Sequence, residues 1–390
     1  MSEYPSDWRV LPLGEVAEVV GGGTPSRDVP AFWGNDHYWI TPSEVVAKDG
    51  QTADRSKEQI SDLGLQSSGA KLHPPGTILM TSRASIGFAA ITQKEICTNQ
   101  GFQSLRCGNE LDNWFALHQI RHRRAELHQL AAGSTFLEVS GSNVRSFPFI
   151  LPPLPEQKKI AEILSGIDNQ MELLQKGVKA KQNLRSALLS ELIAEDAPIT
   201  KLDSVASRVS GHTPSKSHSN YWNGGIPWIS LTDTSKLDNR YISHTAKEIS
   251  KEGIKNSSAV LHPPGLVILS RDARVGCSAI TTKSMAVSQH FVGWICSEKL
   301  LNKYLYYLLQ KWKPKFEAIA MGSTIPTIGV PFFRDLEIPV PPMVIQERIS
   351  ETLESVDREI EALSNKVAML RVLKSGVSSD LLSGRKRVSV

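Results

Sequence analysis

The chain has 390 residues, with 44 Lys and Arg side chains against 40 Asp and Glu, and 40% of its residues are hydrophobic. This length predicts two or three domains, and the ordinary globular composition excludes a wholly disordered chain. No run of about 18 apolar residues occurs, which excludes a membrane-spanning helix, and the polar, acidic N-terminus is unlike a signal peptide.

The cysteines argue for a reducing compartment. Cys97, Cys107, Cys277 and Cys296 form no Cys-x-x-Cys pair, which speaks against a zinc ribbon or a disulfide framework. We therefore expect a cytoplasmic location. The net charge of +4 does not by itself indicate a nucleic-acid partner.

An offset of 189 residues relates the first half of the chain to the second. Leu-His-Pro-Pro-Gly at 72–76 recurs at 261–265, Thr-Pro-Ser at 24–26 recurs at 213–215, and Gly-Ser-Thr at 133–135 recurs at 322–324. This period is too long for a solenoid, so the sequence predicts one domain-sized unit copied once, with pseudo-two-fold symmetry.

Each copy begins with a segment rich in Gly, Pro, Ser, Thr and Trp, which we assign to residues 1–154 and 199–344. Short apolar runs follow turn signals, as in Gly-Thr-Ile-Leu-Met at 76–80 behind His-Pro-Pro, and this pattern predicts strands. One amphipathic helix is predicted near 111–131, with its copy near 300–321. The sequence thus predicts two tandem α+β domains of mixed sheet and helix.

Each copy ends in a long helix, which we assign to residues 155–198 and 345–390. Apolar residues alternate at spacings of four and three, which is the heptad seam of a coiled coil. In the first copy they are Ile160, Leu164, Ile167, Met171, Leu174 and Val178, continued by Leu184, Leu188 and Leu192. In the second they are Ile349, Leu353, Val356, Ile360, Leu363 and Val367, continued by Leu373, Val377 and Leu381.

Two equal helices, each following a globular unit, are predicted to pack on each other. The pseudo-two-fold makes them antiparallel, as a coiled coil about 57 Å long with the globular units at opposite ends.

Charge is divided unevenly between these segments. Residues 1–154 carry 13 basic and 16 acidic side chains, net −3, whereas residues 199–344 carry 17 and 10, net +7. A phosphate-binding surface on the first segment would have to be local, and its dense basic cluster is Arg121-His122-Arg123-Arg124. Lys303, Lys311, Lys313 and Lys315 lie in the corresponding part of the second copy.

No catalytic pattern can be assigned from the sequence. His-Pro-Pro-Gly lacks the Asp or Asn and the aromatic residue of an amino-methyltransferase loop, and neither a dinucleotide-binding glycine motif nor a P-loop occurs. Glu156-Gln157-Lys158 has the letters of a nuclease motif, but no partner Asp strand is present and the copy reads Ile345-Gln346-Glu347. No Cys/His cluster has the spacing of metal ligands.

The duplicated order of these motifs resembles the specificity subunits of type I restriction–modification enzymes over nearly the whole chain. The motifs are Gly-x-Thr-Pro-Ser at 22–26 and 211–215, Trp39 and Trp228, Gly133 and Gly322, and Pro-Pro segments that lead to Gln157 and Gln346. The second copy departs from the family's Pro-x-x-Glu-Gln pattern at Ile345.

The resemblance implies that each globular unit is a target recognition domain for one half of a split double-stranded DNA sequence, and that the helices set the spacer. It implies a non-catalytic chain without a cofactor of its own. Two modification subunits would bind S-adenosylmethionine and methylate adenine, and restriction subunits would use ATP and Mg²⁺ to cleave unmodified DNA. Gln157 and Gln346 are expected to bind these partners.

Polar side chains of the recognition units are the candidate DNA contacts, because such groups read base edges while phosphate contacts fix the register. In the first unit they are Arg27, Arg83, Ser85, Asn99, Gln100, Arg121, Arg123 and Arg124. In the second they are Lys216, Arg271, Arg274, Ser288, Gln289 and His290. Positions that differ between the copies, such as Ser85 and Arg274, are favoured because two half-sites differ. Given the charge of −3 on the first unit, partner subunits are expected to supply much of the grip on DNA.

The alternative is a coiled-coil adaptor that holds two protein partners without reading DNA. A self-sufficient methyltransferase is a more distant alternative, because the chain lacks the catalytic loop.

Overall fold

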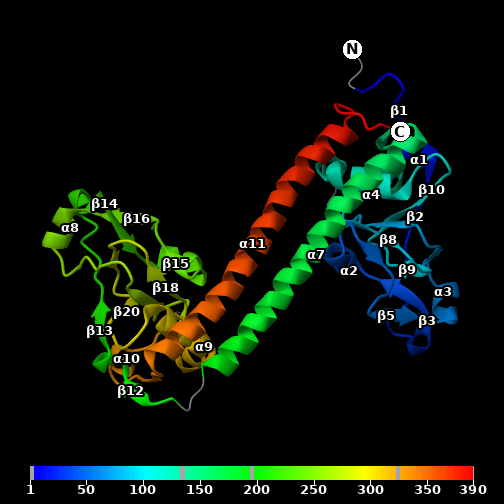
Figure 1. Ribbon diagram of the computed structural model, residues 1–390. Helices are drawn as coiled ribbons and strands as arrows, with labels where there is room; N and C mark the ends of the chain where they lie inside the picture. The colour runs from blue at the N-terminus through cyan, green and yellow to red at the C-terminus, as the bar shows by residue number, and fades with distance from the viewer. Residues whose placement is uncertain (1–3, 132–136, 194–196, 322–325, 390) are drawn as a thin grey trace. The chain divides into compact units, whose positions relative to one another are not determined.

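The computed structural model of the chain describes residues 4–131, 137–193, 197–321 and 326–389 (Figure 1). It divides into two compact units, of which unit 1 comprises Met1–Gln175 with Asn365–Val390 and unit 2 comprises Lys176–Ser364. Each unit therefore contains a globular domain and parts of both long helices, α7 (Leu154–Leu192) and α11 (Met343–Leu382). The Gly-Ser-Thr motifs with Gly133 and Gly322 lie outside the described residues.

The globular part of unit 1 contains two larger sheets and one short ladder. The first sheet has the order β2 (Ala17–Gly21), β10 (Gln103–Cys107), β7 (Ile78–Met80), β8 (Ala89–Thr92) and β4 (Thr52–Ala53). The second has the order β5 (Glu58–Ile60), β3 (Trp33–Ile40), β9 (Ile96–Thr98) and β6 (Leu72–His73), and the ladder joins β1 (Arg9–Pro12) to β11 (Pro148–Leu151). The pairs β4–β8 and β3–β9 are parallel and the others antiparallel, so the sheets are mixed.

Unit 2 repeats this arrangement. Its first sheet has the order β13 (Ala206–Ser210), β20 (Phe291–Cys296), β17 (Val267–Ser270), β18 (Ser278–Thr281) and β15 (Tyr241–Ile242). Its second sheet has the order β16 (Lys247–Ile249), β14 (Trp222–Ile229) and β19 (Ala286–Val287). The ladder joins β12 (Ile199–Lys201) to β21 (Glu337–Pro339). The predicted α+β fold of two tandem mixed domains is confirmed.

Short helices lie between the strands. In unit 1 they are α1 (Leu13–Val16), η1 (Pro30–Phe32), α2 (Pro42–Ala47), α3 (Asp62–Gln66), α4 (Asn113–His122), α5 (Arg124–Gln129) and α6 (Gly141–Ser146). In unit 2 they are η2 (Leu202–Ser204), η3 (Ser219–Tyr221), η4 (Leu231–Asp238), α8 (Lys251–Lys255), α9 (Asn302–Ile319) and α10 (Val330–Arg334).

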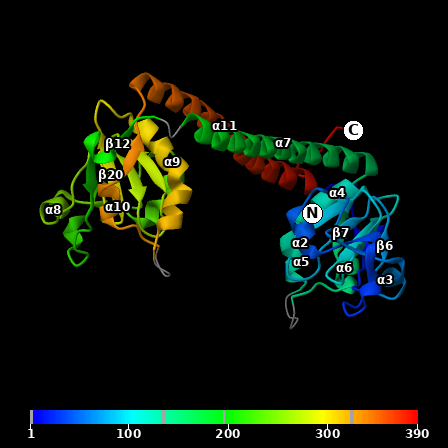
Figure 2. The ribbon, with the colours of Figure 1, turned by 90° about the horizontal axis from the view of Figure 1, so that it is seen from below.

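The predicted amphipathic helix differs between the copies. Within unit 2, α9 is continuous and packs on β17 and β18 (Figure 2), whereas in unit 1 the helix is divided at Arg123 into α4 and α5. The Arg123 guanidinium bonds the Pro148 carbonyl oxygen and the Glu126 carboxylate, and it stacks on Phe147. Trp312 occupies the equivalent position of α9, so this internal arginine is particular to unit 1.

The Leu-His-Pro-Pro-Gly turns lead into strands β7 and β17, as predicted. Gly76 and Gly265 both have φ of +88°, a conformation that residues with a side chain rarely adopt. His73 and His262 precede these turns and are buried. Burial lowers the pKa of the His73 imidazole to about 4, so this side chain is a neutral part of the core at neutral pH.

A pair of tryptophans fixes the Thr-Pro-Ser loop in each unit. Trp33 and Trp39 meet edge to face with ring centroids 5.2 Å apart, and Trp222 and Trp228 repeat that geometry at 5.2 Å. The indole nitrogen of Trp33 donates to the Ser26 carbonyl oxygen at 3.1 Å, and Trp222 makes the same bond in unit 2. Trp39 and Trp228 are buried and belong to the core of their units.

The long helices pair in antiparallel fashion within each unit. In unit 1, Ile160 and Leu164 of α7 share a core with Leu381 and Leu382 of α11, and further along Asp168 bonds Lys374. In unit 2, Ile349 and Leu353 share a core with Leu189 and Ile193, and Arg185 bonds Asp357. The residue numbers of the two helices run in opposite directions in both cases, which confirms the antiparallel coiled coil.

The seam departs from the predicted apolar stripe after its midpoint. Leu184 and Leu373 remain 42% and 53% exposed, so the prediction that they continue the seam is wrong. The heptad spacing instead continues through Arg185 and Lys374. These positions were not assigned to the seam because the criterion was apolar character and both residues are charged. Both bond carboxylates on the opposite helix at 2.5 Å.

None of the helices in the described ranges is long and apolar enough to cross a membrane.

One aspartate in each unit joins the globular domain to both long helices. Asp168 of α7 accepts a bond from Arg121 of α4 at 3.1 Å and one from Lys374 of α11. At the equivalent position, Asp357 of α11 accepts a bond from the Tyr307 hydroxyl of α9 at 2.8 Å and one from Arg185 of α7. A carboxylate enclosed by cations from different elements fixes their relative register, since a shift would leave a partly buried charge without a partner.

The glutamines near the start of each long helix are internal. Gln157 is fully buried, and its amide bonds the Asp112 backbone nitrogen and the carbonyl oxygens of Glu110 and Pro152 at 2.8–2.9 Å. Gln346 makes the equivalent three bonds in unit 2. All polar atoms of these amides have partners within their own unit, so the expectation that they bind a partner subunit finds no support here.

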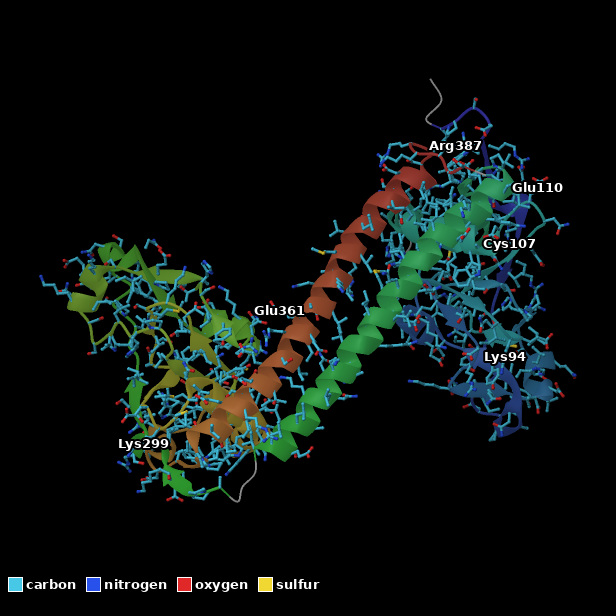
Figure 3. The ribbon with its side chains drawn as sticks, viewed as in Figure 1. Lys94, Cys107, Glu110, Lys299, Glu361 and Arg387 are labelled. Carbon is cyan, nitrogen blue, oxygen red and sulfur yellow. The ribbon has the colours of Figure 1, made fainter. Side chains whose placement is uncertain are left out.

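Glu156, beside Gln157, joins the two ends of the chain. Its buried carboxylate accepts bonds from the Trp8 indole at 3.0 Å and from Arg387 at 2.6 and 2.7 Å, and Arg387 also binds Asp7 (Figure 3). Ile345 occupies the equivalent position of unit 2.

The buried glutamines give the first prediction. Gln157→Ala leaves two buried acceptors and one donor unpaired, so we expect the free energy of unfolding to fall by about 2–4 kcal/mol in urea denaturation. The exposed Gln182→Ala is the matched control and should change it by less than about 0.5 kcal/mol. Normal stability of the Gln157 variant together with loss of partner binding would restore the docking role.

His118 gives the second prediction. Burial lowers the pKa of its imidazole to about 3, with the Lys374 ammonium as the next cause, although the Asp168 carboxylate opposes this. Between pH 6.5 and about 3 the unfolded chain therefore binds a proton that the folded chain does not. The contribution of neutral His118 to the free energy of unfolding is therefore fully present above pH 6.5 and is lost as the pH falls towards 3.

The direction of this pH dependence can be checked with His118→Gln, which removes the titrating group. We expect the wild-type chain to lose about 3 kcal/mol more than the variant between pH 7 and pH 4.5, measured by chemical denaturation. The exposed His244→Gln should behave like the wild type. Equal losses in wild type and His118→Gln would show that burial of neutral His118 is not the cause.

Candidate nucleic-acid interface

Four loops meet along one edge of each globular domain. We call this the recognition edge, and it consists of residues 24–27, 81–87, 99–101 and 137–140 in unit 1, and 213–216, 270–276, 288–290 and 326–329 in unit 2. Backbone bonds hold the loops together, such as Ser82 N to Gly101 O at 2.8 Å and Val139 N to Ser82 O at 2.9 Å. Loops supported in this way can present side chains in a fixed geometry.

In unit 1 the edge presents the polar side chains of Arg83, Glu138, Gln100 and Arg27. Arg83 is half-exposed and pairs with Glu138 at 2.9 Å. Gln100 bonds the Thr24 hydroxyl, and Arg27 stacks 3.8 Å above Trp33 while pairing with Glu58. Each side chain is thus oriented by a neighbour but keeps part of its surface in solvent.

In unit 2 the equivalent edge is built around Asp272. Its carboxylate accepts a bond from Nδ1 of His290 at 2.7 Å and another from the Thr327 hydroxyl. The imidazole is about a third exposed, with its second nitrogen directed away from this bond. Gln289 bonds the Thr213 hydroxyl at 2.6 Å, as Gln100 does in unit 1.

The two edges differ in chemistry at equal positions. Asp272 occupies the place of Arg83, Thr327 that of Glu138, and His290 that of Gly101. The sequence alone did not single out Glu138, Asp272 or Thr327. A search for positions that differ across the repeat, applied to the carboxylates as well as the cations, would have found them.

The loop after β7 and β17 has an unusual backbone conformation in both units. Ala84 and Ala273 have φ of +55° and +63°, in the left-handed region that residues with a side chain seldom adopt. Their backbone nitrogens bond the Leu137 and Pro326 carbonyl oxygens at 3.2 and 2.9 Å. Such local strain is typical of functional loops whose surroundings hold them in place.

Several predicted residues lie on the edge but face inward. Ser288 is completely buried, and Asn99 bonds the Gly101 backbone nitrogen at 2.9 Å. Arg271 donates to the carbonyl oxygens of Gln289 and Ile328 at 3.1 Å. These three support the loops, whereas Ser85 is partly exposed and Arg274 and Lys216 are exposed at the same edge.

The basic cluster of unit 1 adjoins the recognition edge at Gly87. Arg121 and Arg124 both bind Asp49, at 3.2 and 2.7 Å, and Arg123 is buried against Glu126. Arg124 also donates to the Gly87 carbonyl oxygen at 3.0 Å and stacks on Phe88. The cluster therefore joins the loop 81–87 to α4 and to the long helices.

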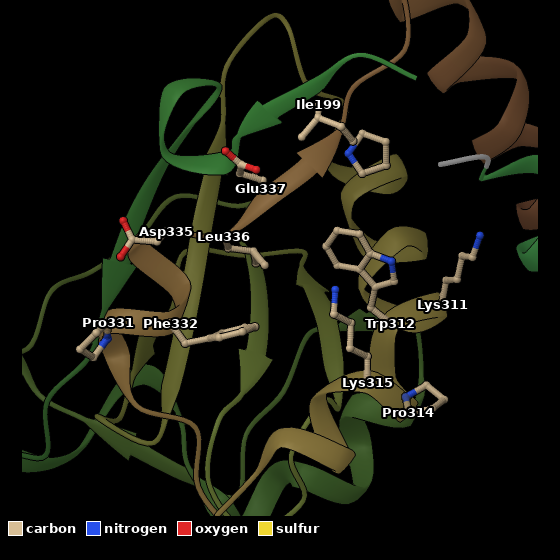
Figure 4. A pocket seen from close by; sticks show the side chains of 11 residues that line it. Ile199, Lys311, Trp312, Pro314, Lys315, Pro331, Phe332, Asp335, Leu336 and Glu337 are labelled. Atoms are coloured by element: carbon tan, nitrogen blue, oxygen red, sulfur yellow. The ribbon is translucent and has the colours of Figure 1, made fainter. Parts of the chain in front are cut away.

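Unit 2 has a groove where unit 1 has Arg123. Trp312 and Phe332 face each other across it, and Lys311 and Lys315 lie on the side of Trp312 (Figure 4). Its volume is about 990 Å³. Within the described residues, no group of three or more His, Cys, Asp or Glu side chains is arranged to hold a metal ion.

Comparison with known proteins relates both units to one family. The model of the type I restriction modification DNA specificity domain matches residues 5–181 and 195–369. The MjaIX type I restriction enzyme specificity subunit of Methanocaldococcus jannaschii is 24% identical over 100% of this chain and 95% of its own length. The EcoR124I/EcoR124II specificity subunit of Escherichia coli is 27% identical over 46% of this chain and 45% of its own.

Solved structures share the fold over the full length. The S subunit of a type I restriction–modification system from M. genitalium has a TM-score of 0.63 at 13% identity and covers 96% of both chains. A chain from a structural study of type I restriction–modification complex assembly and conformational transition has a TM-score of 0.62 at 18% identity, covering 99% of this chain and 100% of its own.

Proposed function

The chain belongs to the type I restriction modification DNA specificity family, and on this premise we propose that it reads the target sequence of a type I restriction–modification complex. Specificity subunits of this kind act with DNA and with methylase and restriction subunits, and they are the non-catalytic components of the complex. The family match does not favour the alternative of a coiled-coil adaptor that reads no DNA.

Each unit reads one half of a bipartite double-stranded target. The observation that carries this proposal is the recognition edge, which has the same loop framework in both units but different polar groups at equal positions. The Arg83–Glu138 pair in unit 1 presents a guanidinium, which suits guanine. The His290–Asp272 pair in unit 2 presents an imidazole nitrogen in a fixed orientation. Different groups on one framework would read different bases.

The paired helices set the distance between the two half-sites. A helix of 39 or 40 residues is about 60 Å long, and the polar seam pairs at Asp168 and Asp357 oppose sliding. A spacer held in this way would fix the number of base pairs between the bases that are read.

The chemistry belongs to the partners in this proposal. Two methylase subunits would bind S-adenosylmethionine and methylate adenine, and restriction subunits would use ATP and Mg²⁺ to cleave unmodified DNA. The complex would act in the cytoplasm, where the chromosome of a prokaryotic cell lies. This chain would bind no cofactor and would decide where the complex stops.

Single substitutions in each recognition edge test whether each unit reads one half-site. Arg83→Gln should relax the bases read by unit 1 and leave the other half-site intact, because a lost bidentate contact reduces discrimination by about 1–3 kcal/mol. His290→Ala should relax the bases read by unit 2 and leave the half-site of unit 1 intact. Methylome sequencing of cells that express each variant with its partner subunits measures both halves at once. Changes in both half-sites from one substitution would contradict independent reading.

A matched insertion tests the spacer. One heptad inserted after Gln175 and one after Ser364 lengthens both helices by about 10 Å, equivalent to about three base pairs. We expect methylation to move to targets with a longer spacer or to be lost. A heptad in α7 alone should mispair the seam and abolish methylation. Continued methylation at the original spacing with both insertions would refute a helical ruler.

A further inference from the structure

A polar pocket lies in unit 1 where α4, α7 and α11 meet. Its volume is about 380 Å³, and it is lined by Arg121, Arg124, Asp49, Asp168, Arg371 and Lys374, with His118 and His122 beside them. Arg371 and Lys374 come from the other end of the sequence, some 250 residues after the basic cluster of α4 and α5. The fold thus enlarges that cluster with two cations that the sequence does not place there.

The pocket contains more positive than negative charge. Arg121 and Lys374 bind Asp168, and Arg121 and Arg124 bind Asp49, so three cations already surround two carboxylates. Arg371 is the fourth cation, and among the described residues it has no ion-pair partner. Two positive charges are therefore in excess even with both histidines neutral.

Three of the four cations are partly buried, whereas Arg371 is exposed. The side chains of Arg121, Arg124 and Lys374 are only 21%, 27% and 14% exposed, so water screens them incompletely. Burial lowers the pKa of the Lys374 ammonium, and the Arg121 charge is the next cause. Like charges are thus close enough to repel each other, and an added anion would relieve that repulsion.

The equivalent place in unit 2 is arranged differently. Gln310 and Gln182 replace Arg121 and Arg371, and Tyr307 replaces His118. Asp357 is instead satisfied by Arg185, Arg240 and the Tyr307 hydroxyl. The cations Arg121 and Arg371 are therefore particular to unit 1, the unit whose recognition segment is net −3.

We propose that this pocket holds a phosphate group of the DNA backbone next to the half-site read by unit 1. The inference rests on the proposed function and adds to it a phosphate contact that fixes the register of unit 1. Guanidinium and ammonium groups are the usual partners of phosphate oxygens. The contact is local, as the overall charge of the segment requires.

The position of Arg124 favours DNA over a free anion. Arg124 lines the pocket and also bonds the Gly87 carbonyl oxygen, at the end of the loop that carries Arg83. Four residues of chain span at most about 14 Å, so the pocket lies near the base-reading side chain. Since the major groove is about 12 Å wide, a base edge that meets Arg83 has backbone phosphates within similar distances.

Arg371→Gln tests the pocket, because it introduces the residue that unit 2 has and removes no ion pair. Binding of the assembled complex with its methylase subunits to a target duplex is measured against salt concentration. We expect wild-type thermal stability, several-fold weaker binding, and a slope of log K against log[salt] reduced by about 0.9, the loss of one phosphate contact. Lys366→Gln removes an equal charge from the exposed surface of α11 and should keep the wild-type slope.

A phosphate scan locates the contact. Single methylphosphonates, which lack the phosphate charge, are placed along the duplex. The wild-type complex should lose affinity at one or two phosphates beside the unit 1 half-site, and the Arg371→Gln complex should lose nothing further there. Equal sensitivity of wild type and variant at every phosphate would overturn the proposal.

A free anion is distinguished in a separate arm. If inorganic phosphate raises the melting temperature of the DNA-free complex but not that of the Arg371→Gln complex, while DNA binding is identical, the pocket takes a free anion and the DNA assignment fails. Failure of the proposed function appears differently. In that event the wild-type complex would select no sequence at all.

Discussion

The enclosed aspartate is the interaction on which each unit depends. Asp168 receives one bond from the globular domain through Arg121 and one from the opposite helix through Lys374. Asp357 does the same in unit 2 with Tyr307 and Arg185. A single partly buried carboxylate thus couples the orientation of a recognition domain to the register of the coiled coil. Such a charge is costly without its partners, so the arrangement selects one register more than it adds stability.

The repeat preserves this coupling while its chemistry changes. Lys374 and Arg185 are equivalent, as are His118 and Tyr307, yet each set satisfies its aspartate in a different way. The same division holds at the recognition edge, where the tryptophan pairs fix the Thr-Pro-Ser loops identically and the exposed groups differ. A duplicated framework can therefore diverge at its edges without disturbing the parts that hold it together.

The sequence predicts what depends on spacing and fails where distant residues meet. The repeat offset, the heptad seam and the buried Trp39 and Trp228 follow from local pattern, and the fold class follows from them. The burial of Gln157 could not be predicted, because a polar position matched across the repeat gives no sign of burial. Leu184 was assigned to the seam because apolar character, rather than charge pairing, was the criterion, whereas Arg185 takes that place in the structure.

The distribution of charge is a further feature that the sequence does not give. A net of −3 over residues 1–154 predicts that any phosphate-binding surface is local, but net charge does not record where the charges lie. Folding brings Arg371 and Lys374 to α4 and leaves carboxylates such as Glu95 and Glu110 exposed elsewhere. Because screening limits surface charges to about 8–10 Å, a cluster of four cations around two carboxylates acts as a positive site on an acidic domain. With the proposed phosphate contact, the binding of unit 1 to DNA depends on helix α11, so the coiled coil contributes a contact as well as a distance.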